Sequence, residues 1–180
     1  GSSNIFLDVV KLNDYFYVAG SSINGTGDER FTKLDSLGNS IYSIFRSPSG
    51  DHDGFFSIEY NNNGDLICYG QQNNGATYFD ASWVTFGQDG TEKSWGNLAY
   101  SGSNTGTDLT KLTNGNFIAV GPGINGGDFI ALLDNNMNQI RLVTQPNPAD
   151  WDYGRAVGDD NSNFVYVFHS NGTNGSSYVY

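Results

Sequence analysis

The chain has 180 residues, enough for one domain with a sizeable core, and 14% of them are aromatic, which excludes a disordered chain. Its 19 acidic residues against 8 Lys and Arg give a net charge of −11, so nucleic acid is excluded as a partner. The sequence has no run of about 18 apolar residues, so membrane insertion is excluded as well.

Short apolar segments separated by turn residues recur along the chain. The segment FYVAG ends at Gly20, LICYG at Gly70, FIAVG at Gly121 and FVYVF at Phe168, in steps of 50, 51 and 47 residues. A second apolar segment follows each of these, at 29–35, 81–87, 128–134 and 176–180. In the first three units a turn and a third segment come next, starting at Ser40, Glu92 and Gln139. A further short segment precedes each unit: FLDVVKL, FFSIEY, TDLTKL and YGRAV.

Each unit therefore contains four predicted strands, and no segment has the sustained 3.6-residue apolar period of a helix. A repeat of about 50 residues with four strands per unit is typical of a β-propeller blade. The sequence predicts a single all-β propeller domain over residues 1–180, with about four blades at 5–52, 53–103, 104–150 and 151–180. The last blade is incomplete, with three strands.

Three interpretations of this incomplete blade are open. The chain forms a four-bladed ring whose last blade has three strands, it is a fragment of a longer propeller, or another chain completes the ring. We favour the first, because four blades is the lower bound of propeller size.

The strings DYFYVAGSS, RFTKLDSLGNSIYSIF and DFIALLDNNMNQIRLV resemble the β-propeller repeats of bacterial secreted and surface proteins. The resemblance covers nearly the whole chain, and it implies blade structure without implying a chemistry. The sequence departs from the pattern at Gly87, where the other units have Asp35 and Asp134, and at Phe168, where the glycine is missing.

Alternation of the strands places the short turns on one face of the domain and the longer loops on the other. Loops on a rigid scaffold commonly carry binding sites, so the face with the long loops is the candidate functional face. Asp28, Asp80 and Asp128 recur at the ends of three of these loops. They are weak candidates for Ca²⁺ ligands. We favour turn-capping residues, because no dense D-x-D-x-D spacing is present, and we expect no cofactor.

Two loop segments contain candidate ligand-binding residues. Asp51, His52 and Asp53 place a histidine between two carboxylates, which suits an acid–base pair, although a solvated polar loop explains it better.

Trp151 and Tyr153 lie beside Asp150 and Asp152. An exposed aromatic ring next to carboxylates can stack on a sugar, so this segment is the best site candidate, and a Trp151 wedged between blades is the alternative.

The strand pattern also predicts which side chains are buried. The expected core residues are Val18, Leu34, Ile44, Ile58, Ile67, Val84, Ile118, Leu132, Leu142 and Val165. Cys68 is expected to be a small buried hydrophobe, and Trp83 and Trp95 are expected to pack between blades.

We find no nucleophile, metal cluster or cofactor motif in the sequence. The favoured function is a non-catalytic extracellular binding module of the adhesin or phage tail-fibre (virion receptor-binding) type, located on a cell or virion surface. It would recognise a cell-surface glycan or protein through the loops of one face. A polysaccharide-acting propeller enzyme, a lyase or glycosidase, is one alternative, and a structural spacer that self-associates through its incomplete last blade is the other.

Overall fold

The computed structural model of the chain describes residues 3–23, 28–48, 52–73, 79–99, 103–124, 128–145, 155–158, 165–168 and 177–179. Their regular structure consists of β-strands. Across these ranges there is no helix with the length and apolar character needed to span a membrane.

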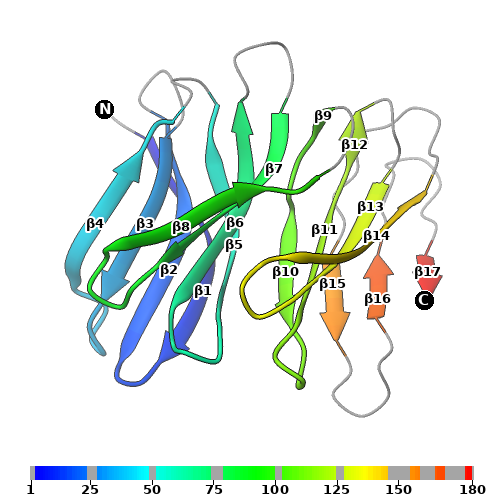
Figure 1. Cartoon of the computed structure of the whole chain (residues 1–180). Coiled ribbons are helices and arrows are strands. Elements are labelled where there is room, and N and C mark those ends of the chain that lie inside the picture. The colour runs from blue at the N-terminus through cyan, green and yellow to red at the C-terminus, as the bar shows by residue number, and fades with distance from the viewer. Residues whose placement is uncertain are drawn as a thin grey trace.

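Three antiparallel sheets of four strands follow one another along the chain, and a sheet of three strands comes after them (Figure 1). The first sheet contains β1 (Ser3–Leu12), β2 (Tyr15–Ile23), β3 (Asp28–Leu34) and β4 (Ser40–Arg46). The second contains β5 (Gly54–Tyr60), β6 (Leu66–Asn73), β7 (Phe79–Phe86) and β8 (Glu92–Asn97). The third contains β10 (Asp108–Lys111), β11 (Phe117–Gly121), β13 (Asp128–Leu133) and β14 (Gln139–Gln145). The fourth contains β15 (Arg155–Gly158), β16 (Val165–Phe168) and β17 (Ser177–Val179).

The sheets stand side by side in chain order (Figure 1). Their first strands adjoin one another, because β1 packs against β5, β5 against β10 and β10 against β15. This is the radial arrangement of propeller blades, so the predicted all-β propeller, with about four blades and an incomplete last one, is confirmed.

The first and last sheets lie at opposite ends of the row in Figure 1. Phe6 and Val9, on the first strand of the first sheet, are 49% and 56% exposed. The closed four-bladed ring that the sequence favoured is therefore not formed by the sheets that the structure describes.

Five of the hairpin turns share one hydrogen-bond pattern. In the turn after β3, the Gly38 amide donates to the Asp35 carbonyl and the Asp35 amide to the Asn39 carbonyl, at 3.1 and 2.9 Å. Gly38 has a φ of 86°, which a glycine adopts without strain. At the corresponding place after β13 stands Met137, with a φ of 66° and a side chain that is only 4% exposed. Burial of this side chain in the core offsets the cost of its left-handed backbone.

The core consists of layers between successive sheets. Between the first and second sheets, Tyr17 and Phe31 pack with a buried set from the second sheet, and the Phe31 and Phe86 rings stack 4.5 Å apart. That set contains Phe55, Ile58, Leu66, Cys68, Val84 and Phe86. Between the second and third sheets, Ile67 and Tyr69 pack with Phe117 and Phe129.

The structure tests the predicted core. Five of the expected residues are buried: Val18, Ile58, Ile67, Val84 and Ile118. Four are only partly buried: Leu34, Ile44, Leu132 and Leu142. The side chain of Val165 lies outside the described residues. Cys68 is fully buried, which raises the pKa of its thiol well above the usual value.

Of the two tryptophans that were expected between sheets, Trp83 packs against the second core layer. The prediction for Trp95 is wrong, because this side chain is 57% exposed. It lies on β8, the outermost strand of its sheet, and its exposure means that no neighbouring sheet covers it there.

Candidate functional site

The two faces of the row of sheets differ in how their connections are held. One face contains the short turns within each sheet, and we call it the turn face. The other contains the connections between second and third strands and those between sheets, and we call it the loop face (Figure 1).

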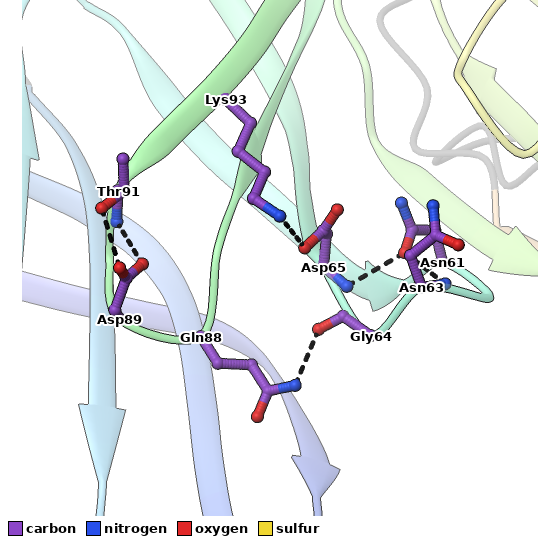
Figure 2. A network of polar contacts seen from close by, with 8 residues as sticks. All are labelled: Asn61, Asn63, Gly64, Asp65, Gln88, Asp89, Thr91 and Lys93. Carbon is purple, nitrogen blue, oxygen red and sulfur yellow. Dashed lines mark hydrogen bonds and ion pairs between the residues drawn. The ribbon is translucent and has the colours of Figure 1, made fainter.

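Polar contacts join neighbouring turns on the turn face. The Gln88 carbonyl accepts hydrogen bonds from Lys33 Nζ at 3.1 Å and Tyr42 Oη at 3.0 Å, both from the first sheet. Figure 2 shows the Gln88 amide donating to the Gly64 carbonyl at 3.1 Å, and the ion pair between Lys93 and Asp65 at 2.5 Å. In the same view, the Thr91 amide and hydroxyl bind Asp89 and lower the pKa of its carboxyl. These side chains already form hydrogen bonds and ion pairs with the turns themselves, so the turn face is a poor candidate for a ligand-binding site.

On the loop face, side chains from the connections between sheets hold the bases of the loops. Side chains from the connections on both sides accept hydrogen bonds from the hairpin of β6 and β7. Asp53, just before β5, accepts the Asn73 amide at the end of β6, at 2.8 Å. From the other side, the side chains of Ser103 and Asn104 accept the amides of Phe79 and Ala81, at 2.9 and 2.6 Å.

The side chains that accept these hydrogen bonds are almost fully buried. Asp53 is 2% exposed, and Ser103 and Asn104 are each 1% exposed. Ser103 and Asn104 form the short strand β9, which pairs with β12 (Gly123–Ile124) after the second strand of the third sheet. Four consecutive connections of the loop face are thereby interlocked, and buried hydrogen bonds fix where the loops leave the scaffold.

A buried carboxyl lies at the same end of the first sheet. Glu29 is fully buried at the start of β3, and Arg46 of β4 forms an ion pair with it. The Arg46 guanidinium also binds Glu92 of β8, at 2.8 Å, and so links the first and second sheets. Burial raises the pKa of Glu29 to about 8, even though the Arg46 charge acts in the opposite direction.

A second polar group joins the first strands of three sheets. The Ser57 hydroxyl of β5 lies 3.0 Å from an Asp8 carboxylate oxygen of β1 and 3.2 Å from one of Asp108 of β10. Ser57 is 1% exposed, while the two aspartates are half-buried. The hydroxyl has one hydrogen to donate, and Asp8 also accepts the Ile58 amide at 2.9 Å. These hydrogen bonds join the first three sheets, and they place the carboxylates of Asp8 and Asp108 close to one another.

The structure places the site residues that were predicted from sequence as follows. His52 is exposed, with a φ of 60°, and its carbonyl accepts a hydrogen bond from Gln71 at 2.9 Å. Asp53 points inward and holds the Asn73 amide. Asp51 and the segment with Asp150, Trp151, Asp152 and Tyr153 lie outside the described residues.

The three candidate Ca²⁺ ligands stand in three different sheets. Asp28 begins β3, Asp80 is the second residue of β7, and Asp128 begins β13. The described part of the chain contains no group of three His, Cys, Asp or Glu residues that could hold a metal ion.

Sequence reasoning missed Glu29, Arg46, Ser57, Ser103 and Asn104. For the serine there was a usable signal, because Asp8, Ser57 and Asp108 are spaced 49 and 51 residues apart and so occupy matching places in the repeat. Arg46 ends β4 and Glu92 begins β8, so the two do not occupy matching places in the repeat, and their roles depend on contacts between sheets.

Comparison with solved structures finds β-propeller proteins. The chain is similar to virginiamycin B lyase from Staphylococcus aureus, with a TM-score of 0.59, 10% identity, and coverage of 99% of this chain and 58% of that one. It is also similar to the GH43 endo-arabinanase from Bacillus licheniformis, with a TM-score of 0.61, 17% identity, and coverage of 97% and 70%. The arabinanase Arb43A from Bacillus subtilis gives a TM-score of 0.61, 18% identity, and coverage of 99% and 72%.

These similarities establish the fold and leave the activity open, since propellers carry many functions. The chain spans little more than half of the lyase and half of a protein from Dyadobacter fermentans, at 58% and 50% of their lengths. A scan against protein-family models and a search of curated proteins each found no match.

Proposed function

We propose that the chain is a non-catalytic binding module, displayed on a cell or virion surface, that recognises a glycan or a protein through its loop face. The observation that carries the proposal is that the buried side chains of Asp53, Ser103 and Asn104 hold the loop bases by hydrogen bonds to backbone amides. Loops with fixed bases lose less conformational entropy when they bind, so a rigid scaffold supports recognition by loops.

Two further features support this function. The loops contain Asn, Gly, Ser and Tyr, which provide adaptable hydrogen bonds and aromatic surface for contact. The turn face, by contrast, uses its polar side chains on its own turns. The ligand is therefore expected at the loop face, with the Trp151 segment as the contact predicted from sequence.

Binding to a glycan array and to whole cells tests the proposal. Trp151→Ala and His52→Ala remove side chains from loop-face segments, while Asp14→Ala removes an exposed side chain from the turn face. We expect Trp151→Ala to weaken binding about tenfold, equivalent to about 1.4 kcal/mol, with an unchanged melting temperature. Asp14→Ala should bind like the wild type. Binding that Asp14→Ala abolishes and both loop-face variants preserve would contradict the proposal.

The rival function is cleavage of a polysaccharide, and one observation favours it. The oxygens of Asp8 and Asp108 that face Ser57 lie at most 6.2 Å apart, the sum of their distances of 3.0 and 3.2 Å to the hydroxyl. This limit includes the separation of about 5 Å between the carboxyl groups of a retaining glycosidase. In the structure, however, both carboxylates already bind groups of the protein. Turnover of a polysaccharide that Asp8→Asn and Asp108→Asn each abolish would establish this rival.

A further inference from the structure

The exposed ring of Trp95 lies next to two polar side chains on the outer part of the second sheet. Trp95 is 57% exposed, and Asn97, two residues farther along β8, is exposed on the same side of the sheet. The side-chain amide of Asn97 donates a hydrogen bond to the carboxylate of Asp80 on β7, at 3.4 Å. We call Trp95, Asn97 and Asp80 the rim cluster. It presents an aromatic ring, an amide and a carboxylate side by side.

The opposite side of the same strand is packed, so the rim cluster has a fixed support. Leu98 is 5% exposed within the core layer between the second and third sheets, and its amide donates to the Ala81 carbonyl at 2.9 Å. A Cβ on Gly96 would stand 2.8 Å from the Trp83 ring, which therefore lies directly against the strand. Because side chains alternate along a strand, burial on this side turns the β8 residues of the rim cluster outward.

The outer strand of the first sheet ends before it reaches the rim cluster. Arg46 is the last residue of β4, and it binds Glu92, the first residue of β8, at 2.8 Å. From this contact β8 leads away from β4 (Figure 1). Trp95 lies three residues beyond Glu92, and its exposure shows that the described part of the first sheet leaves it uncovered.

The face of the Trp95 ring has no cation on it, unlike other exposed aromatic rings of this chain. The Arg30 guanidinium lies 5.3 Å from the centroid of the Phe45 ring. Lys33 Nζ lies 4.0 Å from the centroid of the Tyr15 ring. Within the described ranges, Trp95 takes part in no cation–π or ring–ring contact. Its π face is therefore available to the C–H groups of a ligand.

The charges around the rim cluster favour an uncharged ligand. Arg46 forms ion pairs with two glutamates, and Lys93 forms one with Asp65 at 2.5 Å. Asp80 contributes a carboxylate, in a chain whose net charge is −11. An anion is repelled by these charges, whereas hydroxyl groups can donate to Asp80 and can both donate to and accept from the Asn97 amide.

We propose that the rim cluster binds a neutral sugar, with a pyranose ring stacked on Trp95 and its hydroxyl groups hydrogen-bonded to Asn97 and Asp80. One face of a pyranose consists of C–H groups, which suit an indole ring, and its equatorial hydroxyls suit a neighbouring amide and carboxylate. The site consists of strand residues of the second sheet. It is therefore separate from the Trp151 segment, and it does not require the loop face to bind.

Titration with neutral probes tests this proposal, and we name four: the methyl glycosides of glucose, galactose, mannose and N-acetylglucosamine. NMR spectra of the isotope-labelled chain report on the Trp95 indole N–H and on the Asn97 side-chain amide. We expect both signals to shift saturably with at least one probe, with a Kd of about 1 to 50 mM. Glucuronic acid should bind at least about threefold more weakly than the best neutral probe, because its carboxylate meets that of Asp80.

Variants at the rim cluster separate stacking from hydrogen bonding. Trp95→Ala should weaken binding at least about tenfold, while Trp95→Tyr, which keeps an aromatic ring, should stay within about threefold of the wild type. Asn97→Ala should weaken binding about threefold to tenfold. Ile140→Ala is the matched control, because Ile140 is 54% exposed on β14, the outermost strand of the third sheet, and it should bind like the wild type. An unchanged melting temperature shows that each variant is folded.

Two outcomes of the titration would overturn the proposal: no saturable shift with any of the four probes, or binding that folded Trp95→Ala leaves unchanged. Tighter binding of glucuronic acid than of the neutral probes would contradict it as well. On the glycan array, binding that Trp151→Ala abolishes and Trp95→Ala preserves would refute the rim cluster and leave the proposed function intact. Binding that Trp95→Ala abolishes and both loop-face variants preserve would support the rim cluster and count against recognition by the loops.

Discussion

At the residue scale, a glycine in the second strand of each of the first three sheets lies against backbone in, or just before, the first strand of its sheet. A Cβ built on Gly20, Gly70 or Gly121 would stand 2.0, 1.9 or 1.8 Å from a backbone carbonyl oxygen: that of Ile5, Gly54 or Thr105. A carbonyl in the backbone cannot move aside as a side chain can. The spacing of the glycines in the sequence therefore reflects one close approach repeated in three sheets.

Gly70→Ala should consequently destabilise the protein by about 3 kcal/mol or more, measured by denaturant unfolding. Gly38→Ala is the matched control, because a Cβ there meets nothing within 4 Å and the cost comes only from the φ of 86°. That control should lose about 1 kcal/mol. A smaller loss for Gly70→Ala than for Gly38→Ala would show that the strands can separate at little cost.

The departure of the sequence from the repeat pattern at Gly87 also has a local explanation. Asp35 caps its turn by accepting the amides of Leu37 and Asn39, at 2.9 Å each. In the second sheet, Asp89 accepts the Thr91 amide at 3.0 Å, and its carboxylate lies 2.7 Å from where a Cβ on Gly87 would stand. The carboxylate has moved two residues along the chain while its function in the turn is kept.

At the element scale, Glu29 connects strands of two sheets through Arg46, and its titration couples this connection to pH. The folded protein holds a proton on Glu29 up to a pH of about 8, because burial raises this pKa, whereas the unfolded chain releases it near 4.5. Between these values the folded state binds more protons. Its stability is therefore greatest at the acidic end of the window and falls as the pH rises toward 8.

Glu29→Gln should remove this dependence, since an amide does not titrate. We expect the wild type to lose on the order of a few kcal/mol of unfolding free energy between about pH 5 and pH 8, with a much flatter profile for Glu29→Gln. Glu92→Gln is a useful comparison, because Glu92 binds the same arginine from an exposed position. A wild-type profile that rises with pH over this window would mean that Arg46 keeps Glu29 ionised.

The sequence predicted the strands well because each is a short apolar run between turn residues. The segments FIAVG and DFIALL, for example, coincide with β11 and β13. Burial was less predictable at Leu34, Ile44 and Leu142, because the alternation of a strand does not say how far the neighbouring sheet extends over it. The same limit explains Trp95, which has the apolar character of a core residue but stands on an outermost strand.

At the scale of the whole molecule, the contacts between sheets decide which residues surround a candidate site. In the sequence, Asp53 cannot be distinguished from an exposed acidic loop residue. In the fold it is buried and accepts a hydrogen bond from the amide of Asn73. Ser57 meets Asp8 and Asp108 only because three first strands lie next to one another. Such pairings join residues about 20 to 50 positions apart, and local sequence patterns contain no information on them.

Recognition through the loop face requires that face to be a rigid platform, and native-state hydrogen exchange of the 180-residue chain measures its rigidity directly. The amides of Asn73, Phe79 and Ala81, which bind buried side chains at the loop bases, should exchange at least about a thousandfold more slowly than unprotected amides. Asn104→Ala should speed exchange at Ala81 about tenfold or more while the Val84 amide, farther along β7, keeps its protection. Exchange at these three amides as fast as in an unstructured peptide would show that the loop bases are not fixed, and would contradict the proposed binding function.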